Sequence, residues 1–131
     1  MGKQIGALSS EQLAQVVVKG IQEKKGEEIV VMDLRKVNNA IADFFVICSG
    51  TSDTHIDGIS DSVDKEVSTA SGENPWHREG TNNKTWVLLD YVDVVVHIFN
   101  RENRANYKLE DLWSDADITH YDEEPYNDLK F

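Results

Sequence analysis

One stretch of the sequence, residues 85–99, constrains the possible folds more than any other. It consists of two runs rich in branched and aromatic residues, 85–89 and 94–99, which are separated by the short segment Asp90-Tyr91-Val92-Asp93. Two such runs around a short break bracketed by aspartates predict a β-hairpin with its turn at the break. The rest of the chain has to supply what this hairpin packs against.

Both faces of the predicted hairpin are apolar. Side chains alternate across a strand, so residues of the same parity share a face. One face of the first run carries Trp86 and Leu88 and the other Val87 and Leu89; in the second run Val94, Val96 and Ile98 oppose Val95, His97 and Phe99. A hairpin in an antiparallel sheet with one face in water would be polar on that side. We therefore expect one face to meet helices and the other to meet further protein, from this chain or from a partner.

The segments around the hairpin read as alternating helices and strands. The expected order is a helix over 10–25, strands over 29–34 and 44–48, a helix from Ser52, a short edge strand at Trp76 and His77, the hairpin, and a third helix from Asn100. This order predicts a single α/β or α+β domain with a mixed sheet of about four to five strands and about three helices.

Two glycines carry specific expectations. Gly26 is expected to end the first helix in the left-handed conformation. Gly58 lies inside the second helix, whose apolar stripe is Ile56, Ile59, Val63 and Val67. A helical glycine costs about 1 kcal/mol relative to alanine. We expect this cost to be tolerated because the helix packs closely on a strand there.

Charge and composition limit the partners and the compartment. The net charge is -11, with 24 acidic and 13 basic side chains, which opposes approach to phosphate backbones and favours basic partners. Little or no direct nucleic-acid binding is expected; solubility alone is the other reason for such acidity. Residues 1–10 contain one lysine and no apolar core of signal-peptide length, and no segment has the ~20 apolar residues that span a bilayer. The single cysteine, Cys48, lies in an apolar run. A cytoplasmic protein without membrane contact is expected.

The C-terminal part is expected to differ from the rest. Residues 1–116 are predicted to form the domain. Residues 117–131 are acidic and sparse in apolar residues, which predicts a flexible tail.

Candidate chemistry is weak. The turn from Ser49 to Ser52 joins a strand to a helix, where backbone amides can hold a phosphate, but it lacks the lysine and glycine spacing of a phosphate-binding loop. Asp90, Asp93 and His97 suggest a magnesium site, yet residues three apart across a turn need not converge. No base is placed beside a nucleophile. We therefore predict no catalytic residue, no metal and no cofactor.

Several blocks, in this order, resemble the Iojap-like ribosomal silencing factors. They are residues 43–52, Glu79-Gly80, residues 86–90, residues 93–99 and residues 107–113. The resemblance is collinear from about Leu13 to Ala116, and the acidic tail lies outside it.

The resemblance implies a non-enzymatic protein with a degenerate nucleotidyltransferase-like fold that is a homodimer when free. Such factors bind the large ribosomal subunit through large-subunit ribosomal protein fourteen and block association with the small subunit, so translation is repressed when nutrients are short. One alternative is a nucleotidyltransferase-like enzyme that binds nucleotide through Asp90, Asp93 and the turn over residues 49–52. Another is an adaptor that works through its acidic tail.

The resemblance also implies partner-binding residues. The family's partner-contacting tryptophan corresponds to Trp86, and Leu88 shares its strand face. The remaining candidates are Asp90, Tyr91 and Asp93 at the turn and Glu79 and Gly80 on the approach to the strand. His97 belongs to the motif without an assigned role. Val92 stands where the family has glycine, and a branched residue disfavours positive φ, so the turn type and the position of Asp93 stay open.

Overall fold

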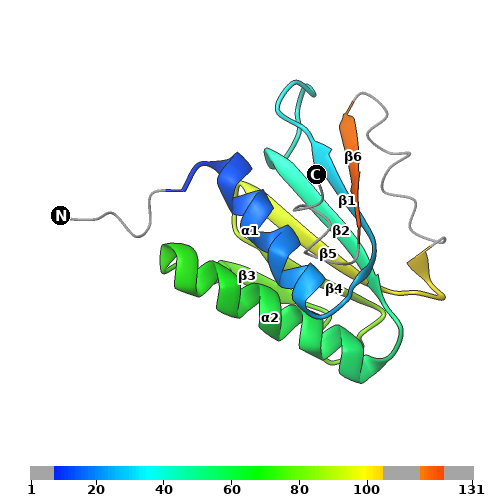
Figure 1. Ribbon diagram of the computed structural model, residues 1–131. Coiled ribbons are helices and arrows are strands. Elements are labelled where there is room, and N and C mark those ends of the chain that lie inside the picture. The colour runs from blue at the N-terminus through cyan, green and yellow to red at the C-terminus, as the bar shows by residue number, and fades with distance from the viewer. Residues whose placement is uncertain (1–7, 105–115, 123–131) are drawn as a thin grey trace, which may run out of the picture.

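The computed structural model describes residues 8–104 and 116–122. Within them lie two helices, α1 (Ser10–Glu23) and α2 (Asp53–Ser71), and six strands, β1 (Glu27–Asp33), β2 (Phe44–Gly50), β3 (His77–Glu79), β4 (Trp86–Asp90), β5 (Val94–Asn100) and β6 (Asp117–Tyr121). The strands form one sheet in the order β3-β4-β5-β2-β1-β6, and both helices lie on the same side of it (Figure 1). In this sheet β2 and β5 run parallel and the other neighbours antiparallel. The predicted single α+β domain with a mixed sheet is confirmed.

Two expectations near the C-terminus need correction. Asn100 does not begin a helix, because it is the last residue of β5 and a turn follows it; the rest of the predicted third helix lies outside the described residues. The expected tail begins with a strand instead, since Asp117–Tyr121 pairs along β1 as β6. The rest of the predicted tail, residues 123–131, is outside the described part. In the part of the chain that the structure describes, the sheet therefore has six strands rather than four or five.

The first helix starts as predicted and ends differently. The Ser9 hydroxyl accepts from the backbone amide of Gln12, and the Gln12 side chain accepts from the backbone amide of Ser9, which forms a capping box. At the other end Lys25, not Gly26, adopts positive φ, at 56°. A side chain at Gly26 would overlap the side chain of Ile21. The prediction for Gly26 is wrong, because the glycine is needed for close packing rather than for its backbone conformation.

The second helix has the predicted cap and stripe. The Ser52 hydroxyl accepts from the backbone amide of His55, at 3.1 Å. Its four apolar stripe residues are completely buried. Gly58 does not meet a strand, because a Cβ built on it would have only the Cδ of Lys24 within 4.0 Å. The expected reason for this glycine is therefore wrong.

The core consists of two clusters on opposite faces of the sheet, as the two-sided hairpin predicts. One cluster lies between the helices and the sheet and includes Val87, Leu89, Val94, Val96 and Ile98. The other lies on the opposite face and includes Val30, Met32, Phe45, Ile47, Val95 and Phe99, with Trp86 and Leu88 packed at its margin. Full burial of one such side chain contributes about 1.5–3 kcal/mol, so both faces of the hairpin stabilise the fold. Cys48 is completely buried in the first cluster, and burial raises the pKa of its thiol to about 12. Within the described residues no helix is long and apolar enough to cross a membrane.

Candidate functional site

Trp86 lies half-buried at the start of β4, on the sheet face opposite α1 and α2. Its indole N–H donates to Nδ1 of His97, with 3.0 Å between the nitrogens. Trp86 pairs with Phe99 and Leu88 pairs with His97. The contact is therefore a diagonal one between neighbouring strands on one face, as is common for long side chains in sheets. It fixes the orientation of the indole.

His97 is almost completely buried, with 3% of its surface exposed. Its ring meets Phe45 edge-on, with 4.6 Å between centroids, and stacks on Phe99 at 6.4 Å. Burial lowers the pKa of His97 to about 4, so the ring is neutral at pH 7. Nδ1 is the acceptor for Trp86, which places the proton on Nε2. Nε2 has no hydrogen-bond partner within the part of the chain that the structure describes.

Glu79 and Gly80, the predicted residues before β4, differ in their contacts. Gly80 has φ of 80°, and a Cβ on it would overlap the backbone carbonyl of Trp86. This glycine thus allows the connection after β3 to lie directly against the backbone of Trp86. Glu79 is exposed on β3, pairs across the sheet with Leu88, and accepts from Nε2 of His77 at 2.6 Å. The structure therefore brings Glu79 and Gly80 beside Leu88 and Trp86 respectively.

The turn between β4 and β5 shows which backbone conformation Val92 adopts in the position where the family has glycine. Val92 does adopt positive φ, at 77°. The Asp90 carboxylate accepts from the backbone amide of Val92 at 2.7 Å, and the amide of Asp93 donates to the carbonyl of Tyr91 at 3.0 Å. Asp93 is exposed at this turn. A branched residue in this conformation costs of the order of 1–3 kcal/mol, and the bond from Asp90 offsets part of it.

Tyr91 does not lie with Trp86. It belongs to the cluster beneath the helices, and 4% of its surface is exposed. Burial, together with the nearby Asp64, raises the pKa of its hydroxyl well above the usual range. Its parity matches that of Val87 and Leu89, which turns its ring toward α2. Tyr91 thus has little surface for a partner, unlike Trp86, Leu88, Asp90, Asp93 and Glu79.

Two of the three candidate metal residues, His97 and Asp90, are engaged in other contacts. Nδ1 of His97 accepts from Trp86, and one oxygen of Asp90 accepts from Val92. In the described ranges no group of three His, Cys, Asp or Glu side chains could hold a metal ion.

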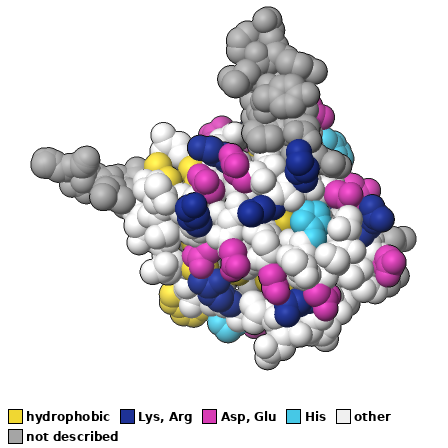
Figure 2. All heavy atoms as spheres, turned by 60° about the horizontal axis from the view of Figure 1, so that its bottom comes forward, with side chains coloured by type: hydrophobic (Ala, Val, Ile, Leu, Met, Phe, Trp, Pro, Cys, Tyr) yellow, Lys and Arg dark blue, Asp and Glu magenta, His cyan; other side chains and the backbone are white. Residues whose placement is uncertain are grey.

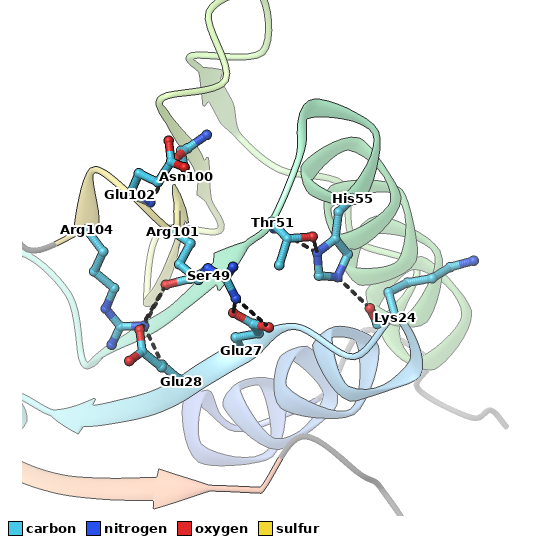
Figure 3. Close-up of polar contacts among 10 residues, drawn as sticks. All are labelled: Lys24, Glu27, Glu28, Ser49, Thr51, His55, Asn100, Arg101, Glu102 and Arg104. Carbon is cyan, nitrogen blue, oxygen red and sulfur yellow. Dashed lines mark hydrogen bonds and ion pairs between the residues drawn. The ribbon is translucent and has the colours of Figure 1, made fainter.

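The strand-to-helix turn after β2 is occupied by contacts within the chain (Figure 3). The backbone amide of Thr51 donates to Nδ1 of His55 at 2.9 Å, and Nε2 of His55 donates to the carbonyl of Lys24 at 2.8 Å. His55 therefore connects this turn to the end of α1. The backbone amides of Thr51 and His55, which could otherwise face a phosphate, thus already have acceptors.

The arginines that follow β5 reach the same region and are paired there (Figure 3). Arg101 contacts the carboxylate of Glu27 at 3.1 Å. Arg104 donates to the hydroxyl of Ser49 at 3.0 Å and to the carbonyl of Glu28 at 2.6 Å. Arg104 also lies 3.7 Å from the carboxylate of Glu28, so the acids on β1 offset the charge of the cations that would attract a phosphate. We refer to residues 49–55 and 100–104 together with Glu27 and Glu28 as the paired end of the sheet.

The side of the molecule on which α2 lies is a solvated surface. Acidic and basic side chains are interspersed over it, with few hydrophobic side chains in view (Figure 2). Ion pairs join α2 to its neighbours, namely Lys19–Glu66, Arg78–Asp64 and Lys84–Asp57. Exposed pairs of this kind contribute about 0–1 kcal/mol each.

Comparisons with known proteins agree on one family. The family model described as "Ribosomal silencing factor during starvation" matches residues 7–130. A "Ribosomal silencing factor RsfS" of Halalkalibacterium halodurans is 38% identical over 109 residues, which cover 83% of this chain and 92% of that protein. A protein of the same name from Bacillus subtilis is 31% identical, over 88% of this chain and 96% of its own length. A crystal structure of a Chromobacterium violaceum protein superposes with a TM-score of 0.76 at 25% identity, and covers 82% of this chain and 88% of that chain.

Proposed function

The chain belongs to the ribosomal silencing factor family, and from that premise we propose that it binds the large ribosomal subunit through large-subunit ribosomal protein fourteen. Bound there, the body of the domain occupies the place of the small subunit and prevents the two from joining. Translation is thereby repressed when nutrients are limiting. The family is named for a regulatory role and not for a catalytic one, and this mechanism needs no covalent chemistry. It operates in the cytoplasm.

The docking surface that we propose is the sheet face around Trp86 and Leu88. The observation that carries the proposal is the hydrogen bond from Trp86 to His97, which holds a half-buried indole in one orientation on the face opposite the helices. Tryptophan is among the residues that most often dominate binding energy. An anchor that is already oriented loses less conformational entropy on binding.

The charges around this face support a basic partner. Glu79 and Asp93 are exposed, and Asp90 is half-buried on the same face as Trp86. The whole chain carries a net charge of -11. A ribosomal protein has to neutralise RNA phosphates with lysine and arginine, so such a protein and this acidic face are complementary, which raises the association rate in particular.

A free molecule is expected to pair through the same face. A homodimer that covers Trp86 and Leu88 would remove apolar surface from water until a ribosome competes for it. The apparent mass, measured by analytical ultracentrifugation, should then rise with concentration, and a mass that stays monomeric at all concentrations contradicts this part of the proposal.

The test is co-sedimentation with purified large subunits, followed by addition of small subunits. Trp86→Ala should weaken binding by at least about tenfold, because it removes a central aromatic anchor. Trp86→Phe keeps the ring and loses the bond to His97, so it should fall between the wild type and Trp86→Ala. Lys65→Ala, on the exposed side of α2, is the matched control and should bind normally.

Two outcomes would overturn the proposal. The first is a wild-type protein that does not sediment with large subunits. The second is a folded Trp86→Ala protein, verified by circular dichroism, that still binds and blocks subunit joining. In the second case the docking surface lies elsewhere, although the family role remains.

The contacts at the paired end weigh against the nucleotidyltransferase-like alternative, because Thr51, Arg101 and Arg104 already have partners within the chain. Calorimetric titration with magnesium and nucleotide should give no saturable heat. A stoichiometric binding curve would revive the enzyme interpretation.

A further inference from the structure

Three segments that meet the end of the sheet where β2 and β5 begin each carry an exposed large hydrophobic side chain. The exposed fractions are 74% for Ile41, 76% for Trp76 and 57% for Val92. Ile41 lies in the connection from β1 to β2, Trp76 directly before β3, and Val92 in the turn from β4 to β5. We call these three residues the sheet-end patch. In the described residues the only other large hydrophobic side chain of this kind is Ile118 on β6, at 39%.

Hydrogen bonds donated by backbone amides connect the three segments of the patch to the sheet. The amide of Trp76 donates to the carbonyl of Asp90 at 2.7 Å, and the amide of Val92 donates to the carboxylate of the same Asp90, also at 2.7 Å. The carbonyl of Asp93 accepts from the amide of Asp43 at 2.8 Å, two residues after Ile41. The patch is thus built on a fixed frame and does not depend on unsupported loops.

Exposure of these side chains has a cost that the fold itself does not require. Apolar surface left in water forgoes roughly 25 cal/mol per Å². Val92 adds backbone strain, because a branched residue there has φ of 77°, and a glycine would fit at lower energy. Strain and exposed apolar surface at one place are typical of a surface that is completed by a partner.

The rim of the patch is acidic. Asp43, Asp90 and Asp93 belong to the hydrogen-bonded frame, and Glu73 precedes Trp76 by three residues. Of the nearby cations, Arg35 is bound to Asp33 at 2.7 Å and also lies near Asp43. Arg78 is bound to Asp64 at 2.6 Å, and Lys36 lies near Asp33. The balance of charge around the patch is therefore negative.

We propose that the sheet-end patch docks a basic polypeptide segment, whose apolar side chains cover Trp76 and Val92 while its lysines or arginines face the acidic rim. Charge selects this occupant. A second copy of the chain would bring the same acids against one another, and a nucleic acid would bring phosphates against them. The patch is at the end of β4 opposite Trp86. It shares Asp90 and Asp93 with the surroundings of the docking face proposed above, but its apolar anchors, Trp76 and Val92, are different residues, so the proposal does not rest on that function.

The test uses two synthetic peptides of equal length, one of alternating lysine and leucine and one of alternating glutamate and leucine, titrated into the ¹⁵N-labelled full chain. The basic peptide should shift the indole N–H resonance of Trp76 and the amide resonances of Val92 and Asp93, and should shift the indole of Trp86 much less. The acidic peptide should shift none of them. Trp76→Phe and Trp86→Phe assign the indole resonances.

Variants separate the patch from general charge. The double variant Trp76→Ser with Val92→Gly keeps every acid of the rim and should bind the basic peptide at least about tenfold more weakly, because it removes the apolar anchors. Ile118→Ser removes the exposed side chain on β6 and should leave the affinity unchanged. The proposal is wrong if Ile118→Ser weakens binding as much as the double variant does, or if the shifts spread evenly over exposed acids of both ends. Since no ribosome is present, failure here leaves the docking of Trp86 untouched, and the reverse also holds.

Discussion

The two ends of the sheet differ in how their side chains are satisfied: one end has paired polar groups and the other has exposed apolar groups. At the paired end, where β2 and β5 terminate, Arg101, Arg104 and His55 each contact a group of the same chain. At the other end the sheet-end patch leaves three large apolar side chains in water, one of them on a strained backbone. The polar groups of the first end are thus paired within the chain, whereas the second end exposes apolar side chains that only a partner would cover.

The difference gives a general expectation for substitutions. At the paired end a change removes contacts that exist in the free protein, so it should lower stability. At the sheet-end patch the contacts are absent in the free protein, so a change can raise stability and still weaken binding. Such an exchange of stability for binding is frequent where strain and exposure serve a function.

The largest effect is expected for Gly80→Ala, close to the paired end. The new methyl group would overlap the carbonyl of Trp86, and φ of 80° disfavours any L side chain. Both effects act together, so we expect a loss of about 3 kcal/mol or more in the free energy of unfolding. Urea denaturation followed by circular dichroism measures it.

Gly80→Asn is the control that separates the two causes. Asparagine tolerates positive φ better than alanine does but has the same Cβ. If overlap with Trp86 dominates, the two variants are equally unstable. A stable Gly80→Asn protein would show that backbone conformation alone selects glycine here, and the close approach to Trp86 would lose its importance.

The second effect concerns His97, which lies in the interior between the two ends. Its pKa is lowered from 6.5 to about 4 in the folded protein, so below pH 6.5 the unfolded chain binds a proton that the folded chain does not. The contribution of His97 to the free energy of unfolding is therefore largest above pH 6.5, and it decreases as the pH falls toward 4. Between pH 7 and pH 5 the expected loss is about 2 kcal/mol.

The matched variant is His97→Phe, which keeps an aromatic ring and cannot titrate. Other groups titrate in both proteins, so the difference between the two stability curves isolates His97. Parallel curves between pH 7 and pH 5 would mean that His97 is protonated as easily in the folded state as in the unfolded one, and the neutral acceptor for Trp86 would be lost with that result.

The third effect tests the strain in the sheet-end patch. Val92→Gly relieves positive φ and removes an exposed side chain, against the larger entropy of a glycine in the unfolded chain. We expect a gain of about 1 kcal/mol in the free energy of unfolding. Thermal denaturation at one pH is sufficient. A less stable variant would show that Val92 contributes contacts to the fold, and the patch would then be better explained as structure.

Local patterns predicted the elements that depend on local interactions. The hairpin, the division of its two faces and the cap and stripe of α2 all follow from alternation, helical spacing and one serine. The contact of Trp86 with His97 could also have been predicted, because the hairpin register places these two side chains at diagonal positions on one face of the sheet.

Elements that depend on distant partners were missed. Asp117–Tyr121 has few apolar residues and becomes a strand because the edge of β1 pairs with it. The predictions for Gly26 and Gly58 were wrong for a related reason. Whether a glycine is needed depends on the atoms that a Cβ would meet, and the sequence near the glycine does not reveal those atoms. Tyr91 was grouped with Trp86 by sequence distance although strand parity separates them. Its position could have been deduced from alternation continued through the turn.

The smallest effect tests whether the contrast between the ends reflects local contacts or location alone. Gly58 lies near the start of α2, close to the paired end, yet a Cβ there meets only the Cδ of Lys24 at 4.0 Å. Gly58→Ala should therefore raise the free energy of unfolding, by somewhat less than about 1 kcal/mol, although a rule based on location predicts a loss.

Gly20→Ala is the opposite case between the same two helices. Its Cβ would approach the Cα of Val63 to 2.9 Å, so it should lower the free energy of unfolding. Urea denaturation of the two variants compares a glycine that has free space beside it, Gly58, with one that is packed against another helix, Gly20. If Gly58→Ala is also destabilising, the side chain of Lys24 contributes packing that the alanine displaces, and the paired end extends farther along α2 than its polar contacts indicate.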